Sequence, residues 1–161
     1  MRLQGDKIKL RPISDSDTEN IVKWRNREFV KKNFFYQELF TKEVHEEWLR
    51  TRVDTGEVDQ FIITRLDTGE DIGSVYIRDI DTVEGIGEYG IFIGEENSLG
   101  LGFGTEAAKL MVEYAGEELR LNKLILRFKE ENERAYKSYL SAGFSLTEKR
   151  EKDAVFMEIL L

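Results

Sequence analysis

The opening residues of the chain alternate between apolar and charged side chains and then change to helical spacing. The alternation over Ile8-Lys9-Leu10-Arg11-Pro12-Ile13 predicts a half-buried strand. Ser14, Asp15 or Ser16 can cap a first helix, and Thr41 can cap a second. Residues on or near one face of these predicted helices are Ile21, Trp24, Arg25 and Phe29 in the first, and Val44, Trp48, Leu49 and Val53 in the second.

The middle of the chain has the pattern of strands joined by short turns. Apolar runs over Phe61–Thr64, Ile72–Ile77 and Gly85–Ile93 predict three strands. Asp67-Thr68-Gly69-Glu70 has the residue types of a hairpin turn between the first two. Short connections make neighbouring strands antiparallel, so we expect an antiparallel meander here.

The last third of the chain alternates helical and strand patterns. We expect a helix over Gly104–Leu119, a strand over Lys123–Phe128 and a second helix over Asn132–Ala142, which Gly143 ends. The closing strands are expected at Phe144–Leu146 and Val155–Leu160. A strand, a helix and a further strand imply a right-handed parallel crossover. The whole pattern predicts an α+β domain around a mixed sheet, antiparallel first and partly parallel at its centre.

Composition limits the chemistry that this domain can perform. At 161 residues, 40% apolar and 35% charged, the chain is expected to form one globular domain over residues 1–161. The absence of cysteine excludes disulfides, thiolate catalysis and zinc–thiolate sites. The acidic series Asp15-x-Asp17-x-Glu19 lacks the glycine of a calcium loop, so no metal is expected.

The charge balance bears on partners and location. A formal net charge of −8 argues against nucleic acid as a partner, because nucleic-acid binding needs a basic face. It favours a cationic partner such as an amine, although an acidic surface also serves solubility alone. No apolar run approaches membrane-spanning length, and the first residues have no apolar leader. We therefore expect a cytoplasmic protein without membrane contact.

The strongest functional signal is Leu99-Gly100-Leu101-Gly102-Phe103-Gly104-Thr105, between the strand that ends at Ile93 and a predicted helix. Such a loop can aim free N–H groups and the positive end of a helix dipole at a phosphate. A P-loop is excluded because Thr105, and no lysine, follows Gly104. A dinucleotide fingerprint has other spacing and needs more chain after it. The pyrophosphate loop of an acetyl-CoA enzyme and a tight connection without ligand remain open.

A second stretch, Asn132 to Phe144, has the form Asn-x-x-Ala-x-x-x-Tyr-x-x-x-Gly-Phe. Its Asn132, Ala135 and Tyr139 lie on one side of the predicted helix. This pattern resembles the signature of the GNAT N-acetyltransferase superfamily.

The glycine stretch resembles the superfamily's Gln/Arg-x-x-Gly-x-Gly/Ala motif. Gly102 and Gly104 take the glycine places, and Leu99 stands where Gln or Arg is usual. The resemblance extends over nearly the whole chain, to the branch with the ribosomal-protein, spermidine and amino-sugar N-acetyltransferases. Segments that fit this branch are Leu10-Arg11-Pro12, Trp24-Arg25-Asn26, His45-Glu46-Glu47-Trp48 and Thr105-Glu106-Ala107.

The resemblance implies a mixed sheet of six to seven strands flanked by about four helices. Acetyl-CoA would bind as co-substrate in a V-shaped opening between two central strands. In the family pattern, strand backbone pairs with the pantetheine arm and can donate an N–H to the thioester oxygen, and the glycine loop binds pyrophosphate. The implied cofactor-binding residues are Ile91, Phe92, Ile93, Leu99, Gly100, Leu101, Gly102, Phe103, Gly104, Thr105, Asn132 and Tyr136.

The same resemblance implies catalytic roles for two side chains. Tyr139 would give a proton to the departing thiolate, and Glu88 would act as base, through water, on an ammonium substrate. Each also has a simpler interpretation, as a core or rim tyrosine and as an exposed strand residue. Trp24, Arg25, Tyr36 and His45 are candidates for the acceptor pocket, although aromatic residues at helical spacing are more often core.

Two functions follow from these patterns. The first is acetyl transfer from acetyl-CoA to a primary amine, with a small amine, an amino sugar or a protein N-terminus as acceptor. The second is a GNAT-fold module that binds acyl-CoA as a sensor or scaffold without turnover. A homodimer is common in such folds and is kept as an expectation.

Overall fold

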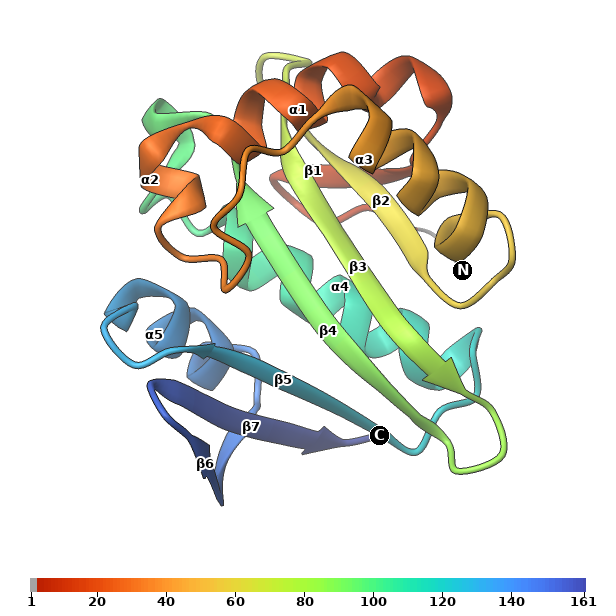
Figure 1. Ribbon diagram of the computed structural model, residues 1–161. Coiled ribbons are helices and arrows are strands. Elements are labelled where there is room, and N and C mark those ends of the chain that lie inside the picture. The colour runs from red at the N-terminus through yellow and green to blue at the C-terminus, as the bar shows by residue number, and fades with distance from the viewer. Residues whose placement is uncertain (1–2) are drawn as a thin grey trace.

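A single seven-stranded mixed sheet organises the computed structural model, which describes residues 3–161 (Figure 1). The strand order is β1-β2-β3-β4-β5-β7-β6. Neighbours pair antiparallel except β4 and β5, which are parallel. The expected α+β class, with parallel pairing at the centre, is confirmed. The strands are β1 (Ile8–Pro12), β2 (Asp59–Arg65), β3 (Asp71–Asp81), β4 (Ile86–Ile93), β5 (Lys123–Lys129), β6 (Ser145–Glu151) and β7 (Ala154–Leu160).

Within residues 3–161 the chain forms five α-helices, one more than expected. The additional helix arises because Arg27 is extended, with φ −67° and ψ 134°, and splits the first predicted helix. The Asn26 side chain stabilises this break, since it donates to Phe40 O and accepts from Phe40 N. The helices are α1 (Thr18–Asn26), α2 (Glu28–Lys31), α3 (Lys42–Trp48), α4 (Phe103–Glu117) and α5 (Glu133–Ser141).

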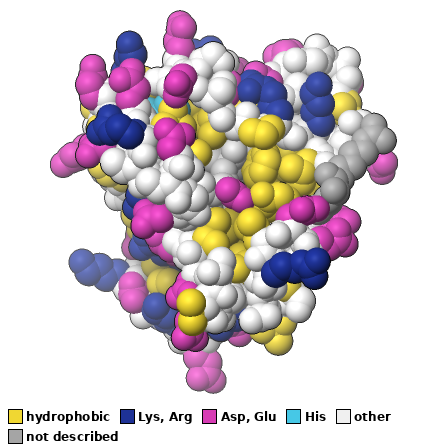
Figure 2. Space-filling view, turned by 90° about the vertical axis from the view of Figure 1, so that its right-hand side faces the viewer, with side chains coloured by type: hydrophobic (Ala, Val, Ile, Leu, Met, Phe, Trp, Pro, Cys, Tyr) yellow, Lys and Arg dark blue, Asp and Glu magenta, His cyan; other side chains and the backbone are white. Residues whose placement is uncertain are grey.

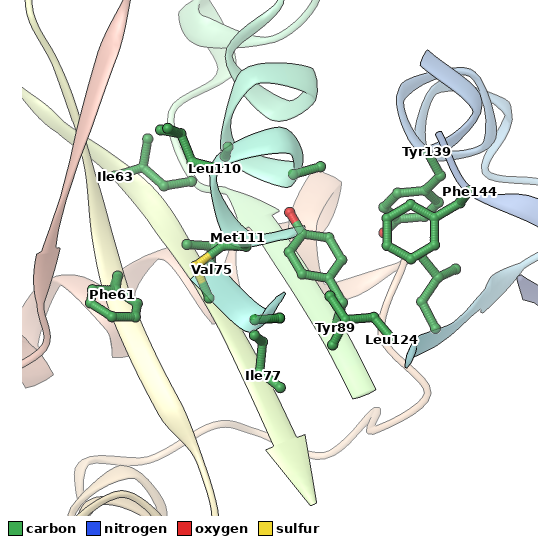
Figure 3. Close-up of a cluster of buried hydrophobic side chains, with 14 of the residues drawn as sticks. Phe61, Ile63, Val75, Ile77, Tyr89, Leu110, Met111, Leu124, Tyr139 and Phe144 are labelled. Carbon is green, nitrogen blue, oxygen red and sulfur yellow. The ribbon is translucent and has the colours of Figure 1, made fainter. Parts of the chain in front are cut away.

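Alternate residues of the central strands supply two cores, one on each face of the sheet. On β2, Phe61 and Ile63 belong to the larger cluster with α4, whereas Ile62 belongs to the smaller cluster with α1. Figure 3 shows the larger cluster, in which Leu110 and Met111 of α4 lie over β2 and β3. The smaller cluster consists of Ile21, Trp24, Val30, Phe40, Ile62 and Phe92.

Charge is dispersed over the surface. Figure 2 shows acidic and basic side chains interspersed around a central apolar area, without a broad basic patch on that face. Among residues 3–161, no helix is long and apolar enough to cross a membrane.

Glu106 joins residues 6–8 to the first turn of α4. Its Oε1 accepts from the N–H of Asp6 at 2.8 Å, and its Oε2 accepts from the N–H groups of Lys7 and Ile8 at 2.9 Å each. Lys7 Nζ then donates to the carbonyl of Leu101 at 2.9 Å. A carboxylate that accepts three N–H bonds therefore positions the loop before α4 against β1.

Replacement of Glu106 by Gln should lower the free energy of unfolding by about 2 kcal/mol, because an amide nitrogen cannot accept the N–H bonds that the lost carboxylate oxygen accepted. Urea denaturation measures this difference. Glu113→Gln, an exposed position on the same helix, serves as the matched control and should stay within about 0.5 kcal/mol of the parent. Equal midpoints for both variants would contradict a clamp at Glu106.

Candidate functional site

A cavity of about 1180 Å³ lies between β4 and β5. The two strands pair over only three residue pairs, from Ile86–Lys123 to Glu88–Ile125. Beyond Glu88, β4 pairs with β3 alone, and β5 continues along β7. The expected V-shaped opening is present, and the backbone from Tyr89 to Ile93 lines it.

One end of the cavity is the N-terminus of α4. Gly100 and Gly102 have φ of +73° and +87°, a region that favours glycine, and Gly102 is the N-cap. The first helical bond runs from Glu106 N to Gly102 O at 3.1 Å. The N–H groups over 103–105 therefore have no intrahelical partner, and the positive end of the helix dipole lies with them. This end of the cavity has the donors that a phosphate needs.

The groove between α4 and α5 is narrow. The hydroxyls of Thr105 and Ser138 are 3.3 Å apart, and a Cβ on Gly104 would lie 3.4 Å from Ser138 Oγ. A longer side chain at position 104 would fill this passage. The predicted loop residues Leu99, Gly100 and Gly102 to Thr105 line the cavity. The side chain of Leu101 does not, and it is 45% exposed. A pyrophosphate fits this arrangement of glycine, hydroxyl and free N–H groups.

Tyr139 lines the cavity from α5 and is only 6% exposed. Its ring meets those of Tyr89 and Phe144 edge-on, with centroids 6.2 and 6.0 Å away (Figure 3). Burial raises the pKa of Tyr139, so the hydroxyl holds its proton at neutral pH. The cavity lining thus includes a protonated tyrosine that packs among buried hydrophobic side chains.

The other two predicted residues near α5 differ in placement. Asn132 lines the cavity and caps α5, since its side-chain oxygen accepts from Ala135 N at 3.2 Å. Its amide NH₂ is the group left for a ligand. Tyr136 is not part of the cavity lining; its ring stacks on Phe128 at 6.1 Å and 22°. Tyr136 was expected to bind the cofactor, but its side chain is partly buried against the larger core cluster.

Glu88 lies on β4 at the last pair before the strands separate. Its side chain is 21% exposed and lines the cavity. Arg127 Nε is 3.5 Å from Glu88 Oε2, and the Arg127 guanidinium lies over the Phe35 ring at 5.2 Å. Glu88 is thus a carboxylate of the cavity lining with one basic partner.

The end of the cavity nearest α1 is aromatic. Arg25 lines it, with its guanidinium carbon 3.6 Å from the centroid of Phe34 and 4.2 Å from that of Phe40. Tyr36 also lines the cavity, 40% exposed, with its ring 6.4 Å from Phe40.

His45 lines the same end and is 1% exposed. Its Nδ1 is 2.9 Å from Thr18 Oγ1, and its Nε2 is buried without a partner. Burial, with the nearby Arg25 charge as the next cause, lowers the pKa of His45 to about 4. The ring is therefore neutral at pH 7.

Trp24, the remaining acceptor-pocket candidate, is not part of the cavity lining. It is 1% exposed, donates from Nε1 to Glu95 Oε2 at 2.7 Å and packs so closely on Gly94 that a Cβ there would lie 2.1 Å from the indole. Its helical spacing identified a core position. Trp24 anchors the segment that follows β4.

A family model described as an acetyltransferase (GNAT) domain matches residues 7–145. The chain belongs to the GNAT acetyltransferase family. This match confirms the family that the glycine loop and the Asn132–Phe144 stretch indicated.

Among curated relatives of this GNAT chain, an uncharacterized protein of Methanocaldococcus jannaschii is 30% identical over 160 residues, which are 98% of the chain and 32% of that protein. The chain thus spans about a third of that relative's length. Spermidine N(1)-acetyltransferase of Escherichia coli K12 is 30% identical over 148 residues, 86% of the chain and 73% of that enzyme. A solved structure of spermidine N-acetyltransferase from Vibrio cholerae, in complex with CoA and spermine, has a TM-score of 0.87 at 21% identity, over 95% of each chain.

The structure adds lining residues that the sequence patterns did not single out. Ser138 and Arg127 come from elements that were predicted, but strand and helix periodicity does not indicate which face meets a cavity. Phe34 and Phe40 come from the irregular segment between α2 and α3, which carries no periodic signal. The run of aromatic residues Phe34-Phe35-Tyr36 is the feature of the sequence that could have indicated a pocket here.

His45 makes stability depend on pH. The pKa of His45 is about 4 in the folded state and about 6.5 in the unfolded state. Between these pH values the unfolded state binds more protons, so the free energy of unfolding decreases as the pH is lowered from about 6.5 to about 4. Between pH 7 and pH 5 the loss from this group should be about 2 kcal/mol.

His45→Gln keeps a group able to bond Thr18 but does not titrate. When the pH is lowered from 7 to 5, the free energy of unfolding of the variant should decrease by about 2 kcal/mol less than that of the parent. Asp15, Asp17 and Glu46, which act on His45 electrostatically, are present in both proteins. Parallel pH profiles from urea denaturation would contradict a buried neutral His45.

Proposed function

We propose that this chain transfers an acetyl group from acetyl-CoA to the nitrogen of a primary amine. The observation that carries the proposal is one continuous cavity. Free N–H groups of α4 lie at one end, and Tyr139 and Glu88 line its wall. Anion binding and proton transfer, the two requirements of this reaction, thus have candidate groups along a single passage.

The binding part of the proposal rests on backbone groups. The N–H groups over 103–105, with the turn at Gly100 and Gly102, would hold the pyrophosphate. The unpaired edge of β4 from Ile91 to Ile93 would pair with the pantetheine arm as a neighbouring strand does. An N–H there would stabilise charge that develops on the thioester oxygen. Bound acetyl-CoA supplies the activated acetyl group.

Tyr139 is proposed as the general acid. Its raised pKa keeps the hydroxyl protonated at neutral pH, so a proton is present for the sulfur as the carbon–sulfur bond breaks, and the tyrosinate then regains a proton from solvent. The direct attack of a neutral amine needs no covalent enzyme intermediate, which suits a chain without cysteine. Glu88 is proposed as the base that takes a proton from the ammonium form of the acceptor, directly or through water.

The acceptor is proposed to be a small amine. Spermidine N-acetyltransferases stand among the relatives and the similar structures, and the net charge of −8 attracts cationic molecules over distance. Dimer formation stays a prediction.

A thiol-release assay with acetyl-CoA and a panel of small amines tests this activity. Tyr139→Phe should lower kcat about a hundredfold with little change in the KM for acetyl-CoA, because the variant loses only the proton donor. Tyr136→Phe is the matched control on the same helix and should retain the parental kcat. Full activity of Tyr139→Phe would refute the general-acid role. CoA binding without turnover of any amine would favour a sensor or scaffold.

Glu88→Gln should lower kcat/KM at pH 7 by at least about tenfold. The deficit should shrink as pH rises toward the pKa of the acceptor amine, since free amine then no longer needs a base. Glu158→Gln is the control: Glu158 also sits on a strand and pairs with a basic residue of β5, Lys123 at 3.4 Å. A deficit that stays constant up to pH 9.5 would show that Glu88 does not act as a base.

A further inference from the structure

Arg25 is held between aromatic rings at the α1 end of the cavity. The guanidinium carbon lies 3.6 Å from the Phe34 centroid, 4.2 Å from that of Phe40 and 5.8 Å from that of Phe92. Contacts of this kind are cation–π contacts, in which the positive charge meets the ring. They give no acceptor to the five N–H donors of the guanidinium.

Within residues 3–161, Arg25 has no acidic partner. Arg134 of α5, which also lines the cavity, has none either but is exposed, whereas the three other arginines of the lining are paired. Arg52 pairs with Glu57 and Asp79, Arg78 pairs with Asp79, and Arg127 pairs with Glu88. For Arg25, residues 3–161 provide neither an ion pair nor a hydrogen bond; it has the aromatic rings, and Tyr76 and Tyr36 act on it electrostatically. Burial lowers the pKa of Arg25, which reflects the cost of a charge that lacks a counter-ion.

A second donor at this end also lacks a partner. His45 Nε2 is buried without a hydrogen bond, whereas Nδ1 is 2.9 Å from the Thr18 hydroxyl. When that hydroxyl donates to Nδ1, the neutral ring carries its hydrogen on Nε2 and becomes a donor. Arg25 and His45 share the Phe40 ring, whose centroid lies 4.2 Å from the Arg25 guanidinium carbon and 6.1 Å from the His45 ring centroid.

An unpaired guanidinium in a partly buried aromatic clamp is costly unless a ligand completes it. The fork of N–H donors matches the paired oxygens of a carboxylate or a phosphate. A polyamine offers no such oxygen and would be repelled by Arg25. The overall acidic charge attracts cations to the protein, but the charge at this end of the cavity selects for the opposite sign.

We propose that the acetyl acceptor carries an oxyanion, a carboxylate or a phosphate, in addition to its amine, and that Arg25 binds this oxyanion. The inference rests on the proposed acetyl transfer and names the substrate class of the same cavity. His45 Nε2 then adds a neutral donor beside the guanidinium. Arg25 is a specificity-determining residue in this scheme, whereas Tyr139 and Glu88 serve the reaction itself.

Matched pairs of acceptors test the inference. Glucosamine 6-phosphate against glucosamine is the phosphate arm, β-alanine against β-alaninamide is the carboxylate arm, and spermidine is the cationic reference. In at least one arm, kcat/KM of the parent should be about tenfold or more higher for the anionic member, and higher than for spermidine. The arm with the larger ratio identifies the oxyanion.

Arg25→Met keeps an apolar, flexible side chain between Phe34 and Phe40 but removes the charge and the donors. In this variant the ratio of kcat/KM for the anionic member to that for the neutral member should fall to within about threefold of one. Arg25→Lys, a point charge without the fork, should give an intermediate ratio. Tm should not drop by more than about 5 °C in Arg25→Met, because the change removes an uncompensated charge.

Three results would overturn the inference. Transfer to neutral amines or spermidine without anionic preference in either arm would leave the proposed acetyl transfer standing and refute the oxyanion. An anionic preference that survives in Arg25→Met would place the oxyanion elsewhere. Absence of transfer to every acceptor, with CoA bound, would refute the proposed activity and the inference together.

Discussion

Every feature of the cavity depends on how briefly β4 and β5 pair. A parallel pair that continued along both strands would fill the space between them with inter-strand hydrogen bonds and leave no unpaired edge on β4. Pairing stops after Glu88; residues of α5 and of the N-terminus of α4 line the opening beyond it, while β7 pairs with β5. The sheet is thus stable as a whole, yet one of its central strands keeps backbone donors and acceptors for a ligand.

Most of the fold follows from periodicity in the sequence. The seven strands, the parallel crossover and the helices that became α4 and α5 are confirmed, although β3 and β6 end at Asp81 and Glu151, well beyond the expected Ile77 and Leu146. The break at Arg27 was not predicted, because it depends on the distant Phe40 backbone that the Asn26 side chain holds. Local pattern reports which residues can share a face. It does not report a turn that a tertiary hydrogen bond stabilises.

The site, too, was predicted only where local sequence determines the structure. The glycine loop and Asn132 could be found because each shapes the backbone locally, and such residues recur at a characteristic spacing in the sequence. Trp24 and Tyr136 have the right residue type and spacing but belong to the core, since burial depends on what packs against each helix face. The partners of Arg25 come from an irregular segment, so the absence of a counter-ion becomes visible only when charges and rings are placed in space.

The bonds from residues 6–8 to Glu106 limit how the proposed phosphate site can be reused. The glycine loop owes its shape to contacts that join residues nearly one hundred positions apart in the chain. Transplanted alone between a strand and a helix of another protein, the loop would lack the segment that braces it from outside. The anion site is thus a property of the closed domain, and a sequence match to its glycines alone is weaker support for phosphate binding than a match that also includes this acidic residue and its β1 partner.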